Sequence, residues 1–109
     1  MNQIEIYFMD DSELSEFEAS EKGYRLDVYV LIDDKLYNLK IYDMIRLKQD
    51  FYNEIEQQSY YSIESNLIIV KQVSKKEICI SIEGLFKERY FDDLKPVNDF
   101  DISKLVKIN

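Results

Sequence analysis

The chain contains no histidine, one cysteine and two glycines among its 109 residues. Catalytic triads and Cys–His dyads use histidine as the general base, so its absence excludes the usual nucleophilic hydrolases. Structural zinc sites need Cys and His ligands, and a phosphate-binding loop needs closely spaced glycines. We therefore expect a protein that is not an enzyme and that holds neither a metal ion nor a cofactor.

A carboxylate-only active site is the remaining catalytic alternative, because paired carboxylates can bind magnesium or cleave a glycosidic bond. The candidates are the adjacent pairs Asp10-Asp11 and Asp33-Asp34. Neighbouring residues of a strand point to opposite sides, so such pairs do not converge on one substrate there. We therefore favour a non-catalytic function.

Proline is also scarce, and with one proline and two glycines the chain has no flexible linker. Hydrophobic residues make up 46% of the sequence, which is enough apolar material for one core, and the length predicts a single domain over residues 1–109. No segment resembles a signal peptide or a membrane span, and the lone Cys79 cannot form an internal disulfide. We expect a cytoplasmic location and a buried Cys79.

The formal net charge is −8, and the whole excess lies in the first third of the chain. Residues 1–34 contain ten acidic and two basic residues, whereas residues 35–109 contain twelve of each. A nucleic-acid-binding surface needs clustered Lys and Arg, so this distribution argues against nucleic acid and for a basic protein partner. A surface that only keeps the domain soluble is the alternative.

The acidic excess is densest in residues 10–21, which carry six carboxylates and no basic residue. Ser12 can cap a short helix of about two turns there, within what otherwise reads as a loop. We hypothesise that the carboxylates of this segment and of the next turn contact the partner. These residues are Asp10, Asp11, Glu13, Glu16, Glu18, Glu21, Asp33 and Asp34.

Alternating apolar and polar residues predict strands over residues 3–9, 24–32 and 36–42. The polar residues 33–35 have the length and chemistry of a hairpin turn between the last two strands. Asp33-Asp34 lacks the further spaced oxygen ligands and the glycine of a calcium loop, so we interpret it as a turn.

Apolar residues at spacings of three and four predict an amphipathic helix over residues 43–58, capped by Asp43. We expect Phe51 and Tyr52 to pack from this helix against the sheet. A polar, aromatic connection follows, in which Tyr60-Tyr61 is either a partly exposed interface anchor or a cover over the core.

Residues 67–73 form an apolar, β-branched run typical of an inner strand. Residues 75–91 fit a helix that starts with a capping box from Ser74 to Glu77, although alternating isoleucines at 78–82 would also suit a strand. The tail after Pro96 can dock as a strand or a short helix. Together these segments predict an α+β fold, with a four- or five-stranded, mainly antiparallel sheet and two helices packed on one face.

The order of an acidic N-terminal segment, a hairpin, a helix, SNLIIV (residues 65–70) and ERYFDDL (residues 88–94) resembles one group of proteins. These are the small acidic cytosolic immunity proteins of bacterial polymorphic-toxin and contact-dependent growth inhibition systems. The resemblance implies tight one-to-one binding to a cognate toxin domain, commonly a nuclease. It assigns no role to any single position, because such proteins have no catalytic residues and place their contacts differently.

The charge distribution agrees with this function, because nuclease sites that hold phosphates are basic and attract a carboxylate-bearing surface. Two alternatives remain open. One is a non-catalytic adaptor or assembly protein that uses its sheet edge or Tyr60-Tyr61; the other is a phage-type acidic nucleic-acid mimic that inhibits a host DNA-handling protein. Association through carboxylates should slow as salt rises, whereas apolar docking should not.

Overall fold

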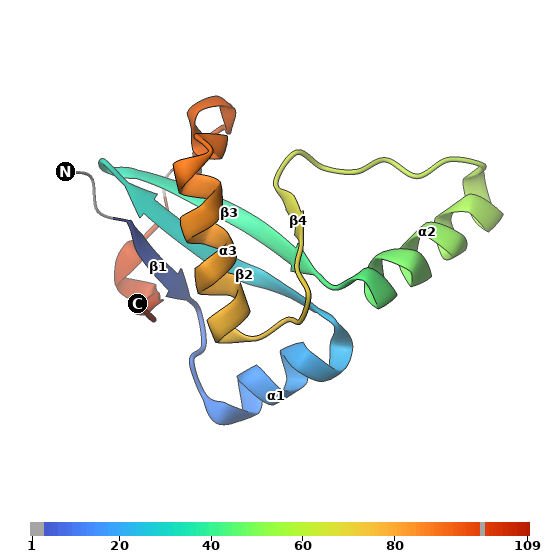
Figure 1. Ribbon diagram of the computed structural model, residues 1–109, viewed down its shortest axis with the longest axis horizontal. Helices are drawn as coiled ribbons and strands as arrows, with labels where there is room; N and C mark the ends of the chain where they lie inside the picture. Colours follow the sequence, from blue (N-terminus) through green and yellow to red (C-terminus); the bar gives the residue numbers. More distant parts are fainter. Residues whose placement is uncertain (1–3, 99) are drawn as a thin grey trace.

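A mixed, mostly antiparallel sheet forms the centre of the computed structural model, which describes residues 4–98 and 100–109 (Figure 1). Within these residues it has five strands in the order β4-β3-β2-β1-β5. The strands are β1 (Glu5–Phe8), β2 (Tyr24–Ile32), β3 (Lys35–Tyr42), β4 (Leu67–Ile69) and β5 (Val106–Lys107). β3 and β4 pair in parallel, and the other neighbours pair antiparallel. The predicted α+β class is confirmed.

The described part of the chain contains three α-helices, one more than predicted. They are α1 (Glu13–Lys22), α2 (Met44–Gln58) and α3 (Lys75–Lys87), with 3-10 turns at Tyr90–Asp93 and Ile102–Lys104. Ser12, Asp43 and Ser74 each cap one helix by accepting a hydrogen bond from a backbone N–H three residues later.

The predicted hairpin of β2 and β3 is confirmed. Asp33 and Asp34 form its two-residue turn with φ values of 48° and 67°. Two successive positive φ values are typical of a type I′ turn, whose twist matches that of paired strands. The pairing is interrupted by a bulge between Arg25 and Val28, near the start of β2.

α3 covers one face of the sheet, as Figure 1 shows, and its Ile78 and Ile82 are fully buried. They join one hydrophobic core with Ile6, Val28 and other side chains of β1, β2 and β3. Residues 78–82 therefore belong to the helix that the capping box predicted, and not to the alternative strand. The helix stops at Lys87 and not at residue 91, because Arg89 adopts a left-handed φ of 64° and starts a 3-10 turn.

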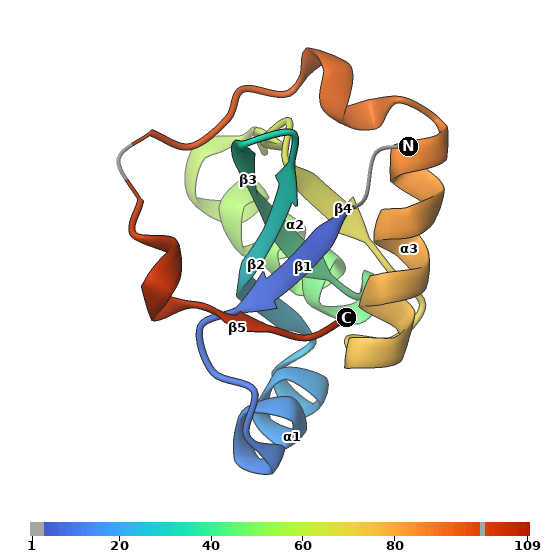
Figure 2. The same ribbon diagram turned by 90° about the vertical axis from the view of Figure 1, so that its left-hand side faces the viewer.

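The C-terminal segment runs along the opposite face and then joins the sheet (Figure 2). The Phe100 ring lies 4.8 Å from the Tyr29 ring, and β5 pairs with β1. The Asn109 side chain accepts a hydrogen bond from the N–H of Ile6 at 2.8 Å and donates one to the carbonyl of Ile4 at 3.0 Å. The tail thus forms both predicted alternatives, a short 3-10 turn and a strand.

α2 does not pack on the sheet, so the prediction that Phe51 and Tyr52 are core residues is wrong. Phe51 is 43% exposed, Tyr52 is 63% exposed, and none of residues 44–58, all of which the structure describes, is buried. α3 already occupies the sheet face that α2 was expected to share. α2 instead projects at one end of the long axis (Figure 1), and the radius of gyration is 14.4 Å, against about 13 Å for a compact domain of this length.

The prediction of an inner strand over residues 67–73 is also wrong, because β4 has three residues and lies at the edge of the sheet. Val70 and Val73 are buried, but they lie beyond the end of β4, where the chain leads into α3. The apolar run therefore extends past the strand, and its last valines pack in the core. Cys79, expected to be buried, is half-buried beside the core, and burial raises the pKa of its thiol.

Candidate partner-binding surface

The acidic segment folds as a ten-residue helix, α1, which is longer than the predicted two turns. Ser12 Oγ accepts a hydrogen bond from the N–H of Ser15 at 3.1 Å, and Gly23 ends the helix with a φ of 78° and an N–H bonded to the Ala19 carbonyl at 2.9 Å. Glycine adopts this left-handed conformation without strain. Both ends of α1 are therefore fixed by local hydrogen bonds.

Arg25 anchors the start of α1 to the sheet. It is buried, with only 4% of the residue exposed. Its Nη2 donates to Ser15 Oγ at 3.0 Å and to the carbonyl of Asp10, while its Nε donates to Asp27 at 2.8 Å. The guanidinium also lies 3.7 Å from the centre of the Phe8 ring. Sequence reasoning missed this residue; the available signal was that Arg25 is one of two basic residues in the acidic third of the chain.

Three of the predicted partner-binding carboxylates bind within the protein itself. Asp10 accepts a hydrogen bond from the N–H of Ser12 at 2.9 Å, and hydrogen bonds from Ser12 lower the pKa of Asp10. Asp11 pairs with Lys75 Nζ at 2.5 Å, and the Glu16 carboxylate accepts from the backbone N–H of Lys75 at 3.0 and 3.2 Å. Asp11 and Glu16 therefore hold α1 against the N-terminus of α3, where the helix dipole favours negative charge.

The outer side of α1 presents free carboxylates together with apolar side chains. Among the described residues, no hydrogen-bond or ion-pair partner is found for Glu13, Glu18 or Glu21, and all three are exposed. Leu14 is 66% exposed and Phe17 is 62% exposed. We refer to these residues together as the acidic face: Glu13, Leu14, Phe17, Glu18 and Glu21.

A groove of about 480 Å³ adjoins the acidic face, between α1 and the start of α3. Phe17 and Glu13 line it from α1, while Gln72 and Lys75 line it from the other side. The surface therefore combines an aromatic anchor, an adjoining hollow and negative charge. Such a combination suits a partner with a basic and partly apolar surface.

Asp33 and Asp34 do not join this surface. They lie at the hairpin tip, and the nine residues of β2 separate them from α1, a span of roughly 30 Å. Figures 1 and 2 both show α1 and the hairpin tip at opposite ends of β2. Of the eight predicted carboxylates, three therefore bind within the protein, three lie on the acidic face and two lie at the hairpin tip.

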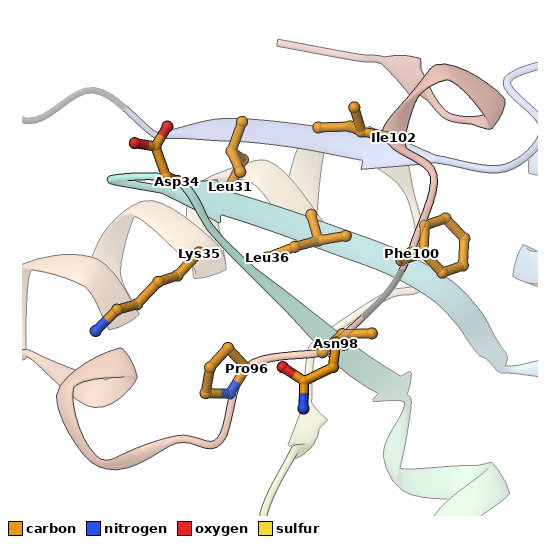
Figure 3. Close-up of a pocket in the computed structure, with 9 residues that line it drawn as sticks. Leu31, Asp34, Lys35, Leu36, Pro96, Asn98, Phe100 and Ile102 are labelled. Atoms are coloured by element: carbon orange, nitrogen blue, oxygen red, sulfur yellow. The ribbon is translucent and has the colours of Figure 1, made fainter.

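A second cleft of about 480 Å³ lies between the hairpin and the C-terminal segment. Figure 3 shows Leu31, Leu36, Phe100 and Ile102 around its apolar interior, with Asp34 at the hairpin end. The charged residues of its lining, Asp34 and Lys35, both come from the hairpin. Among the described residues, no three Cys, Asp or Glu side chains are grouped as metal ligands.

Comparison of the chain with protein-family models, curated proteins and solved structures finds no match. None of the helices within residues 4–98 and 100–109 has the length and apolar character needed to cross a membrane. The resemblance to immunity proteins therefore stays a prediction from the sequence.

Proposed function

We propose that this chain is a non-catalytic inhibitor that binds a basic protein domain through the acidic face, in the manner of an immunity protein and its toxin. The observation that carries the proposal is the exposure of Leu14 and Phe17 among three carboxylates without partners. Leaving two large apolar side chains in water on a well-anchored helix lowers stability slightly, and binding a partner recovers this energy.

The position of the carboxylates supports fast association with a basic partner. The whole charge excess of the chain lies within residues 1–34. α1, which carries Glu13, Glu18 and Glu21, lies at one end of the molecule (Figure 2). A concentrated field of one sign increases encounter rates with an oppositely charged site by about tenfold or more at low salt. An inhibitor that has to reach a toxin before the toxin acts benefits from such a rate.

The finer proposal is that the partner is a cognate bacterial toxin domain with nuclease activity, and that the inhibitor works in the cytoplasm. Nuclease sites bind phosphates with Lys and Arg, so a carboxylate-bearing helix can occupy such a site in place of the phosphates. This step rests on the sequence resemblance together with the acidic face.

Affinity capture tests the proposal when the tagged protein is compared with two triple variants. E13K/E18K/E21K reverses the acidic face, while E83K/E88K/D93K makes the same net charge change at exposed residues of α3 and its 3-10 turn. We expect the wild type and the control variant to retain one small basic domain that is toxic when expressed alone. Neutralisation of that toxicity in cells should be lost only with the acidic-face variant.

Two outcomes would contradict the proposal. Equal capture and equal protection by both triple variants would show that the acidic face does not bind the partner. Capture of a large assembly whose retention is insensitive to salt would favour the adaptor function instead.

A further inference from the structure

The side of α2 that faces away from the protein is apolar and uncovered. Met44 is 51% exposed, Ile45 is 70% exposed and Tyr52 is 63% exposed, and Ile63 of the following loop is 62% exposed nearby. Exposed apolar side chains this closely grouped usually mark a binding surface. We refer to them, with Lys48, Phe51 and Glu56 of the same helix, as the α2 stripe.

The opposite side of α2 is polar and attaches the helix to the sheet. The Arg46 guanidinium lies 4.7 Å from the Tyr24 ring centre and pairs with Asp50 at 3.2 Å. At the border of the α2 stripe, Phe51 contacts Tyr61 of the loop that leads to β4, with ring centres 6.1 Å apart. The helix is therefore held with the exposed α2 stripe turned to the solvent, and α2 as a whole projects from the sheet (Figure 1).

The charges within the α2 stripe are arranged symmetrically about its aromatic centre. Lys48 lies four residues before Tyr52 and Glu56 lies four residues after it, so the three form one row along the helix. Both charged side chains are exposed, and among the described residues neither has an ion-pair partner. If a second α2 runs antiparallel across Tyr52, each Lys48 meets the Glu56 of the other copy.

We propose that the α2 stripe binds the α2 stripe of a second copy of this chain, so that the protein forms a symmetric antiparallel dimer. A two-fold axis beside Tyr52 makes the interface self-complementary, because the same residues come from both copies. Side chains spaced by four residues form ridges along a helix, and such ridges on two helices pack against each other when the helix axes cross at about 50°. The aromatic pairs Phe51 and Tyr52 of both copies then meet at the centre.

The available area suits a dimer of moderate strength. Five large apolar side chains that are 43–70% exposed offer roughly 500 Å² per copy, or about 1,000 Å² in total, which is at the lower limit for specific interfaces. We therefore expect a dimer that forms as concentration rises. The interface uses no residue of the acidic face, so failure of either proposal leaves the other intact.

Sedimentation equilibrium from about 1 to about 500 μM tests the dimer. We expect the mass of the wild type to rise from 13.1 kDa toward twice that value. Y52E should remain monomeric throughout, while L14E, at a similarly exposed site on α1, should dimerise like the wild type. Far-UV circular dichroism should show unchanged folding, since both positions are exposed.

Charge exchange then tests the antiparallel register. K48E alone and E56K alone should each weaken dimerisation by about tenfold, whereas K48E/E56K, or an equimolar mixture of the two single variants, should restore it. The proposal is overturned if the wild type stays monomeric at the highest concentration, if Y52E still dimerises, or if the double variant is no better than the single ones.

Discussion

Replacement of Arg25 by methionine should loosen α1 and lower the stability of the whole domain. Methionine keeps the unbranched stem beside Phe8 but removes the guanidinium, which bonds to Asp27 at 2.8 Å and to Ser15 at 3.0 Å. A hydrogen bond to a buried charged group contributes about 1.5–3 kcal/mol, and the Asp27 side chain, 24% exposed, regains part of its hydration. We expect the free energy of unfolding to fall by about 2–4 kcal/mol.

Urea denaturation followed by tyrosine fluorescence measures this change, because the chain has nine tyrosines and no tryptophan. The midpoint should fall by about 1.5–3 M for a domain of this size. Hydrogen exchange of the α1 amides should quicken more than that of α3, since Arg25 holds the beginning of α1. The matched control is R89M, because Arg89 pairs with Asp92 at 2.8 Å but its side chain is 82% exposed, so its loss should change stability by less than about 1 kcal/mol.

Equal effects of R25M and R89M on the urea midpoint would refute this reasoning. They would mean that burial of the guanidinium does not increase its contribution, and that α1 is held mainly by other contacts.

Three further predictions concern the two glycines, one tyrosine and one glutamate. Gly23→Ala should lower the stability of the domain in thermal unfolding by about 1–3 kcal/mol, because φ is 78° and a Cβ there would lie 2.8 Å from the Asp43 carboxylate. Gly84→Ala should raise the stability by about 0.5–1 kcal/mol in the same assay, because the helix has free space around this position. Burial, and then a hydrogen bond with a neighbouring carboxyl, raise the pKa of Tyr42 to about 12. The folded state thus keeps a proton that the unfolded state loses near pH 10, so stability should fall as pH rises from about 10 to about 12, and Tyr42→Phe should flatten this slope in urea titrations. Glu16→Ala should cost about 1 kcal/mol in urea unfolding by removing the acceptor at the N-terminus of α3, whereas Glu16→Gln, which keeps an acceptor oxygen, should cost less.

Local signals in the sequence were sufficient wherever a few neighbouring residues decide the structure. Ser12, Asp43 and Ser74 marked the helix starts, and Asp33-Asp34 marked the hairpin turn, because caps and turns depend on side chains close in sequence. The strands on both sides of that turn alternate over eight or nine residues, and this made the hairpin predictable.

Long-range packing explains what could not be predicted. The apolar pattern of α2 shows that one side avoids water, but it does not say what covers that side, so Phe51 and Tyr52 were assigned to the core incorrectly. α1 carries few apolar residues in sequence, yet it is a full helix because Arg25, Lys75 and the core around Ala19 fix it from outside.

The candidate site was predicted in part. The sequence showed where carboxylates are concentrated, but it could not separate Asp10, Asp11 and Glu16, which bind within the protein, from the exposed Glu18 and Glu21. That separation depends on α3 meeting α1 across a gap of about sixty residues. Nor could periodicity show that the hairpin tip lies at the far end of β2.

The association rate with the captured partner domain, measured by stopped flow at rising salt, tests the central claim most directly. If the acidic face guides and forms the complex, the rate for the wild type should fall steeply with salt, and at low salt E13K/E18K/E21K should associate at least about tenfold more slowly. D33N/D34N, which keeps residues that tolerate the positive φ of the turn, should associate at a rate close to the wild type. Equal rates and equal salt dependence for the wild type and the acidic-face variant would contradict the account.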